Sequence, residues 1–192
     1  RMNAIVDIRP GDRCAVVEPG VLNGDLQRVL KPHGLFWPPD PTSADFSTIG
    51  GNLACNAGGP RAVKYGASRD NILALTAVTG TGELIHCGSA TTKGATGYDL
   101  QRLLVGSEGT LGVMTEVTVR LAPIAAHRLA LRVVLADRAL LVPALETVRR
   151  HDPAVLEFLD GSFLRLVESD VPEGTAAVLL ADLEGERADA LH

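Results

Sequence analysis

The segment that most constrains the fold spans residues 36–66, which are rich in Pro, Gly, Asn, Ser and Thr and poor in long apolar side chains. A structureless loop of that length is uncommon in a compact domain unless it lines a binding site. Within it, residues 37–43 read Trp-Pro-Pro-Asp-Pro-Thr-Ser, and the prolines restrict the backbone to a stiff, extended turn. We therefore expect a rigid polar rim that presents Thr42 and Ser43.

Two Gly-Gly pairs, at residues 50–51 and 58–59, frame a short helical stretch. Glycine lets the main chain approach a ligand closely, while Thr48, Asn52 and Asn56 offer hydrogen bonds without a fixed charge. If Thr48 caps this helix, the first helical amides are free to face an anion or a carbonyl oxygen. The pattern suits a polar, planar ligand, although Gly-Gly pairs are also typical of tight turns.

Apolar runs bounded by turn residues predict β-strands on both sides of this segment. The predicted strands span residues 5–8, 14–18, 72–78, 83–87 and 113–121, with the first two and the next two forming hairpins. Apolar residues at helical spacing predict a helix over residues 22–30, with Asn23 as its N-cap and with Pro32 and Gly34 ending it.

The sequence pattern changes near residues 122–126, where we place a boundary between a domain of residues 1–122 and a second of residues 123–192. The second domain is predicted to contain strands at residues 128–135, 154–159 and 176–183 and helices at residues 138–150, 163–168 and from 184 onward. This alternation predicts an α+β unit whose helices cover one sheet face. Its apolar helix positions, expected to face the core, are Leu140, Leu141, Leu145 and Val148.

Composition excludes several classes of protein. The chain has 192 residues, 46% of them hydrophobic, and 18 basic against 23 acidic side chains give a net charge of −5. It is therefore neither a disordered acidic tail nor a basic nucleic-acid module. We expect no transmembrane segment and no signal peptide. The three cysteines form no C-x-x-C pair, so we expect no disulfide framework or zinc site and a cytoplasmic location.

Glycine- and proline-bearing motifs follow one another along the first domain. They are Pro38-Pro39-Asp40-Pro41-Thr42-Ser43, Thr48-Ile49-Gly50-Gly51-Asn52, Asn56-Ala57-Gly58-Gly59, Thr96-Gly97-Tyr98-Asp99-Leu100 and Gly106-Ser107-Glu108-Gly109-Thr110-Leu111-Gly112. In these motifs the chain resembles the FAD-linked oxidase family, the flavoproteins typified by vanillyl-alcohol oxidase. It is most similar to the branch of glycolate oxidase subunits and D-lactate or D-2-hydroxyacid dehydrogenases. The resemblance covers residues 5–121 and is weaker from residue 128 onward.

The resemblance implies the second part of a two-subdomain FAD-binding (PCMH-type) domain, followed by the start of an α+β cap domain. The family's upstream diphosphate loop is expected to be missing, so we expect this segment alone to bind FAD poorly and to be inactive. Backbone amides in glycine-rich turns would form most of the contacts with FAD. The residues expected to line the cofactor are Pro39, Asp40, Pro41, Thr42, Ser43, Thr48, Ile49, Gly50, Gly51, Asn52, Asn56, Gly58, Gly59, Tyr65, Gly66, Gly109, Gly112, Val113 and Thr115.

The activity implied by the resemblance is oxidation of a small 2-hydroxy acid, glycolate or D-lactate in type, by hydride transfer to flavin N5. Electrons would pass to a quinone, an iron–sulfur partner subunit or another acceptor, and such a partner would hold the protein peripherally at the inner membrane. Two alternatives stay open. One is the same fold with another substrate class, as in alkyl-glycerone-phosphate synthases or phenol oxidases, and the other is a flavin-free binding or assembly module.

Other reactive residues have structural explanations. The five histidines are scattered without ligand spacing, so we predict no metal site and name no catalytic base. Cys55 could carry a covalent flavin link, but a buried structural thiol is the stronger expectation. Lys64 and Tyr65 are either site residues or part of a surface turn. We expect Glu108 to hold its own loop.

Overall fold

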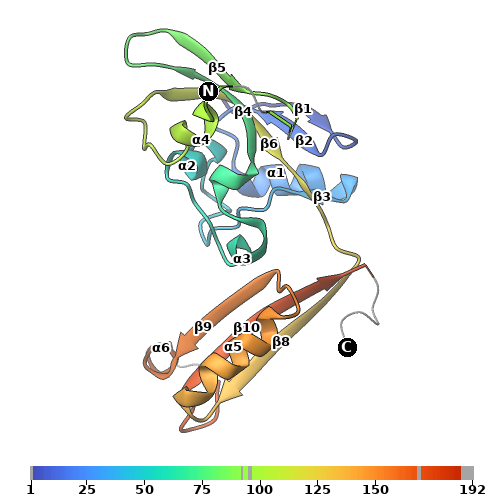
Figure 1. Ribbon diagram of the computed structural model, residues 1–192, viewed down its shortest axis with the longest axis vertical. Helices are drawn as coiled ribbons and strands as arrows, with labels where there is room; N and C mark the ends of the chain where they lie inside the picture. Colours follow the sequence, from blue (N-terminus) through green and yellow to red (C-terminus); the bar gives the residue numbers. More distant parts are fainter. Residues whose placement is uncertain (1, 92, 95–96, 168–169, 187–192) are drawn as a thin grey trace. The chain divides into compact units, whose positions relative to one another are not determined.

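The computed structural model describes residues 2–91, 93–94, 97–167 and 170–186. The chain divides into two compact units, Arg1–Ile124 and Ala125–His192. Both units mix helices and antiparallel strands, which confirms the expected α+β class (Figure 1).

The first unit is built on a five-stranded sheet in the order β1-β2-β6-β4-β5. Its strands are β1 (Ile5–Arg9), β2 (Cys14–Val17), β4 (Ile72–Val78), β5 (Leu84–Gly88) and β6 (Val113–Arg120). Both predicted hairpins are present, because β1 pairs antiparallel with β2 and β4 with β5. The regularly alternating strand β6 takes the central position, where it pairs with both hairpins.

Short helices and a small strand pair complete this unit. They are α1 (Asn23–Leu30), η1 (Lys31–His33), β3 (Leu35–Phe36), α2 (Ile49–Ala54), α3 (Ala62–Tyr65), η2 (Ser68–Asn71), α4 (Leu100–Leu104) and β7 (Ala122–Pro123), with β3 paired to β7. The prediction of Asn23 as the N-cap of α1 is wrong. Leu22 occupies that position, and the buried Asn23 side chain instead donates to the carbonyl oxygen of Pro39 at 3.0 Å.

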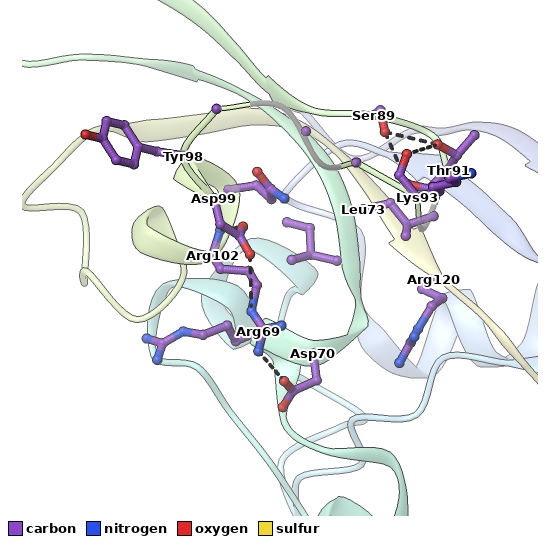
Figure 2. A pocket seen from close by; sticks show the side chains of 15 residues that line it. Arg69, Asp70, Leu73, Ser89, Thr91, Lys93, Tyr98, Asp99, Arg102 and Arg120 are labelled. Atoms are coloured by element: carbon purple, nitrogen blue, oxygen red, sulfur yellow. Dashed lines mark hydrogen bonds and ion pairs between the residues drawn. The ribbon is translucent and has the colours of Figure 1, made fainter.

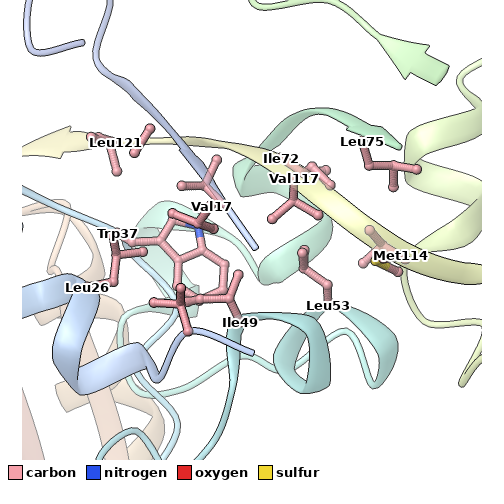
Figure 3. Close-up of a cluster of buried hydrophobic side chains, with 14 of the residues drawn as sticks. Val17, Leu26, Trp37, Ile49, Leu53, Ile72, Leu75, Met114, Val117 and Leu121 are labelled. Carbon is pink, nitrogen blue, oxygen red and sulfur yellow. The ribbon is translucent and has the colours of Figure 1, made fainter. Parts of the chain in front are cut away.

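The core of the first unit lies between the sheet and helices α1, α2 and α4 (Figure 3). Trp37, the chain's single tryptophan, is fully buried there, and its indole Nε1 donates to the carbonyl oxygen of Asn71 at 3.2 Å. Burying so large a ring stabilises the fold by roughly 2–3 kcal/mol or more relative to exposure. The start of the proline-rich segment is therefore anchored in the core.

The second unit is a three-stranded antiparallel sheet in the order β8-β10-β9, with α5 packed on it. Its elements are β8 (His127–Leu135), η3 (Arg138–Leu140), α5 (Leu141–Arg149), β9 (Val155–Asp160), α6 (Gly161–Leu166) and β10 (Ala177–Gly185). Leu145 and Val148 pack against the sheet as expected, but the prediction for Leu140 is wrong because its side chain is 52% exposed in η3.

The last predicted helix is wrong where it can be compared. Glu184 and Gly185 are the final residues of β10, in register with Arg128 and His127 of β8, so the sheet pairing overrides the local helix signal. Residues 187–192 of that prediction lie outside the described residues, as does Glu168 at the end of the preceding predicted helix.

Candidate functional site

The proline-rich rim is held in place by helix α1. Asn23 donates to the carbonyl oxygen of Pro39, and Gln27 Nε2 donates to that of Trp37 at 2.7 Å. Beyond the prolines the chain turns tightly, since the carbonyl oxygen of Ser43 accepts from the amides of Phe46 and Ser47. The rim is thus rigid, as its proline content predicts, and Thr42 in it is exposed.

The second Gly-Gly pair meets this rim. Gly59 has φ +153°, and a Cβ added there would lie 2.5 Å from the carbonyl carbon of Asp40. Next to it, the Asp40 carboxylate accepts from the amide of Arg61 at 3.2 Å and pairs with the Arg61 guanidinium at 3.4 Å. The Asn-Ala-Gly-Gly and Pro-Asp-Pro motifs therefore pack directly on each other, and a side chain at residue 59 would separate them.

Helix α2 begins as the sequence predicts but does not present free amides. Thr48 is its N-cap, and the Thr48 Oγ accepts from the amide of Gly51 at 3.0 Å. The amides of Ile49 and Gly50 donate to the carbonyl oxygens of Val21 and Pro19, both at 2.8 Å. The expectation of free amides at residues 49–51 is therefore wrong, because neighbouring chain satisfies them.

Two members of this motif are buried in different ways. The Ile49 side chain is fully buried in the hydrophobic core, so its side chain contributes to packing. The Asn52 side chain is 3% exposed, and its Nδ2 has no hydrogen-bond partner among the described residues. An amide donor left without a partner in such a place costs about 1–3 kcal/mol, which makes Asn52 a strong candidate for bonding to a ligand.

The C-terminal end of α2 joins three motifs. The carbonyl oxygen of Leu53 accepts from the amide of Gly106 at 2.9 Å, and that of Ala54 accepts from the amide of Glu108 at 3.0 Å. Asn56, which follows directly, has the left-handed φ of 49°. The Gly-Ser-Glu-Gly loop is therefore hydrogen-bonded onto the end of helix α2, directly before the Asn-Ala-Gly-Gly turn, although about fifty residues separate them along the chain.

Tyr65 and Gly66 end the short helix α3. The Tyr65 ring packs edge-on against Phe36, with ring centroids 5.4 Å apart, and its carbonyl oxygen accepts from Asn71 Nδ2 at 2.9 Å. Gly66 has φ +75° and lies so close to Asp70 that a Cβ would approach that carboxylate to 2.5 Å. Tyr65 is thus packed into the domain rather than standing on a loose surface turn.

The start of β6 supplies the last predicted site residues. Val113 is 65% exposed, and Thr115 Oγ1 donates to the carbonyl oxygen of Thr76 on β4 at 3.2 Å. Gly112 cannot carry a side chain here, since its Cβ would lie 2.9 Å from the Val78 carbonyl oxygen. Gly109 has φ +79° and open space around it. An exposed valine beside an open glycine turn is a surface that a planar ligand can cover.

The cysteines differ from the expectation at one position. Cys55 is exposed, so the prediction of a buried structural thiol is wrong there, whereas Cys14 and Cys87 are buried. Burial raises the pKa of both the Cys14 and the Cys87 thiol, because a thiolate would lose its hydration. Cys55, immediately after α2, is the accessible thiol of the three.

No metal-binding cluster of His, Cys, Asp or Glu occurs in the part of the chain that the structure describes. His192 and Thr96, one at the terminus and one in a predicted motif, lie outside it. Among the described helices, none combines the length and apolarity needed to cross a bilayer.

The sequence analysis missed a charged cavity of about 620 Å³ beside these motifs (Figure 2). Its charged lining residues are Arg69, Asp70, Lys93, Asp99, Arg102 and Arg120. Arg102 forms an ion pair with Asp70 at 2.5 Å. Figure 2 shows this pair on one side of the cavity and Arg120 on the other. Of these charged residues only Asp99 belongs to one of the motifs listed above, and only the fold brings η2, α4 and the end of β6 together.

Comparisons with known proteins agree with this arrangement. Residues 1–88 match the family described as FAD binding domain. The glycolate oxidase subunit GlcD of Bacillus subtilis (strain 168) is 41% identical over 193 residues, covering 96% of this chain and 40% of that protein. D-lactate dehydrogenase of Anaerostipes hadrus is 45% identical over 123 residues, covering 64% of this chain and 26% of that protein.

Solved structures show the same fold. An alkyldihydroxyacetonephosphate synthase superposes with a TM-score of 0.80 over 96% of this chain and 38% of its own, at 23% sequence identity. At that identity the likeness concerns the fold alone.

Fold and motifs together define an FAD-binding domain whose second subdomain is the five-stranded unit. The chain belongs to the FAD-linked oxidase family, whose relatives named above are oxidases and dehydrogenases, as the motifs indicated. It spans 40% of the length of the Bacillus relative and 26% of the Anaerostipes relative.

Proposed function

We propose that the protein containing this chain is an FAD-dependent oxidoreductase that oxidises a small 2-hydroxy acid, glycolate or D-lactate in type. The observation that carries the proposal is the meeting of separate motifs at the end of α2, where Leu53 and Ala54 accept from Gly106 and Glu108. The similarity to a glycolate oxidase subunit and a D-lactate dehydrogenase supports the substrate class.

The residues present fit FAD. The orphaned Nδ2 of Asn52 is a neutral donor suited to a carbonyl or phosphate oxygen, and the open turn at Gly109 leaves room for a ligand against Val113. In a chain of net charge −5, neutral donors and glycine turns are a physically reasonable way to hold a diphosphate. We propose that the cofactor is held by residues 39–43, 48–52, 56, 58–59, 65–66, 109, 112–113 and 115.

FAD supplies the hydride acceptor of the reaction when it is bound. The chain's own contribution is rigidity: the rim fixed by Asn23 and Trp37 and the loop fixed on α2 hold their backbone groups before any ligand arrives. Preorganised polar groups of this kind stabilise charge without the cost of reorganisation. Among the described residues we assign no base for the substrate hydroxyl proton.

The proposal extends to an electron acceptor, a quinone or an iron–sulfur partner subunit, and to a cytoplasmic location with peripheral membrane attachment through that partner. Its test is substrate-dependent bleaching of the flavin absorbance in the full-length protein under anaerobic conditions. Glycolate and D-lactate should bleach it, and L-lactate should do so far more slowly.

Two results would contradict the proposal. If a phenol reduced the bound flavin and neither glycolate nor D-lactate did, the protein would have the same fold but act on another substrate class. Failure of the full-length protein to bind FAD at micromolar concentration, a free energy of about −8 kcal/mol, would favour a flavin-free binding module.

A further inference from the structure

Arg69 lies where two of the glycine motifs meet, although it belongs to neither. It is part of the short helix η2, and its backbone amide donates to Asn56 Oδ1 at 2.9 Å. Its guanidinium Nη2 donates to the carbonyl oxygen of Val105 at 2.7 Å. One residue therefore holds the Asn-Ala-Gly-Gly turn with its main chain and the base of the Gly-Ser-Glu-Gly loop with its side chain.

The packing around this guanidinium leaves little freedom. Gly106 has φ +85°, and a Cβ there would lie 2.7 Å from Arg69 Nη2 and 3.2 Å from Asn56 Cβ. Gly106 in turn donates its amide to Leu53, so the guanidinium lies against the loop at the point where the loop joins α2. A shorter or differently shaped side chain at residue 69 cannot reach the Val105 carbonyl in the same way.

The charge of Arg69 is not neutralised within the described residues. The neighbouring Arg102 pairs with Asp70 and Asp99, but no described carboxylate lies within ion-pair distance of Arg69. Its Nε is also buried without a hydrogen-bond partner among the residues described. A half-buried cation without a counter-ion costs free energy unless a negatively charged group, such as an anionic ligand, compensates it.

We propose that Arg69 is a positioning residue of the cofactor site, acting through Val105 and Asn56 to fix the two glycine loops against which the flavin cofactor lies. The proposal rests on FAD binding, the proposed function. The planar guanidinium sets the loop geometry by its hydrogen bond, and its positive charge adds to the attraction for an anionic diphosphate.

The test compares Arg69→Met, Arg69→Lys and the charge-matched control Arg120→Met in the full-length protein. Arg120 lines the same cavity, and none of the hydrogen bonds or ion pairs described above involves its side chain. Both Arg69 variants should raise the Kd for FAD by about tenfold and alter the visible circular dichroism of bound flavin, since a hydrogen bond from a charged donor is lost. Arg120→Met should stay within about twofold of wild type.

A second measurement needs no cofactor. In the FAD-free protein, amide hydrogen exchange at Gly106 and Glu108 should quicken in Arg69→Met while exchange in strand β6 is unchanged. If Arg69→Lys binds FAD with wild-type affinity while Arg69→Met binds it weakly, the positive charge by itself accounts for the affinity and the positioning role is overturned. Unchanged affinity and exchange in Arg69→Met would also overturn it. Absence of FAD binding by the wild type would refute the proposed function instead.

Discussion

Substituting Gly59 by alanine tests whether the Asn-Ala-Gly-Gly motif must touch the Pro-Asp-Pro motif. The backbone at Gly59 has φ +153°, which L-residues with side chains rarely adopt, and forcing one there costs about 1–3 kcal/mol. The new Cβ would also lie 2.5 Å from the carbonyl carbon of Asp40, a backbone atom that cannot rotate away. Relieving such an overlap costs about another 1–3 kcal/mol.

The neighbouring Gly58 is a matched control. A Cβ at Gly58 would meet only Ala62 Cβ, at the ordinary contact distance of 3.5 Å, and its φ lies outside the left-handed region. We therefore expect Gly59→Ala to lower the free energy of unfolding by about 2–6 kcal/mol and Gly58→Ala to change it by less than about 1 kcal/mol.

The assay is urea unfolding followed by the fluorescence of Trp37, which is fully buried in the first unit and is the chain's single tryptophan. A loss of about 2 kcal/mol corresponds to a fall in the midpoint of roughly 1 M urea at typical m-values. The FAD affinity of Gly59→Ala should fall as well, because displacing Asp40 moves the rim. Equal midpoints for the two variants would refute the claim that the Gly59–Asp40 approach is required.

Four other predictions follow from the structure. Cys55 should be alkylated by iodoacetamide in the native protein before Cys14 and Cys87, and equal labelling of all three would contradict their burial. Burial raises the pKa of the Cys14 and Cys87 thiols above the ordinary 9.0, so these thiols stay protonated in the folded protein at a pH where they ionise in the unfolded chain. The urea midpoint should therefore fall as pH rises above about 9, and a rising midpoint would count against this. Thr48→Ala should cost about 1 kcal/mol of stability, because α2 loses its cap, whereas Thr48→Ser should retain most of it; equal losses would argue against capping. Trp37→Phe should cost about 1–3 kcal/mol through its lost hydrogen bond and volume, and an unchanged melting temperature would be inconsistent with its burial.

Strand pairing followed closely from the sequence where periodicity was strong. The alternation in residues 113–121 predicted β6 to within one residue, and the predicted strand at residues 72–78 matches β4. Of the two misses, one has a local cause and the other a long-range one. Helix α4 (Leu100–Leu104) is short, and the Asp99 side chain that caps it is a signal too brief to separate from a loop. At Glu184, pairing with β8 outweighs helix propensity.

In the candidate site, the features that could be predicted from the sequence are local, and those that could not depend on residues distant along the chain. Thr48 as a cap could be predicted because capping is a local interaction. The bonding of the amides of Ile49 and Gly50 could not, because their acceptors, Val21 and Pro19, come from a distant part of the chain. Arg69 escaped notice for the same reason, since its role depends on Val105, which only the fold brings within reach.

The motif glycines themselves separate into two physical groups. Gly50 and Gly59 allow the chain to approach its own backbone, at Pro19 and Asp40, and Gly112 does so at Val78. Their absence of a side chain is explained without any ligand. Gly109 differs from them: its left-handed φ of +79° favours glycine, and the space around it is open.

That distinction identifies where a bound cofactor should be detected. Substitutions at Gly50, Gly59 or Gly112 disturb folding and FAD binding together, so a loss of FAD affinity there does not show that the residue contacts the cofactor. Gly109 and the unpartnered amide of Asn52 are the positions at which the structure leaves room or hydrogen-bonding capacity unused. An effect on FAD affinity that exceeds the effect on stability is therefore expected at these two residues, and contact with the cofactor is best judged there.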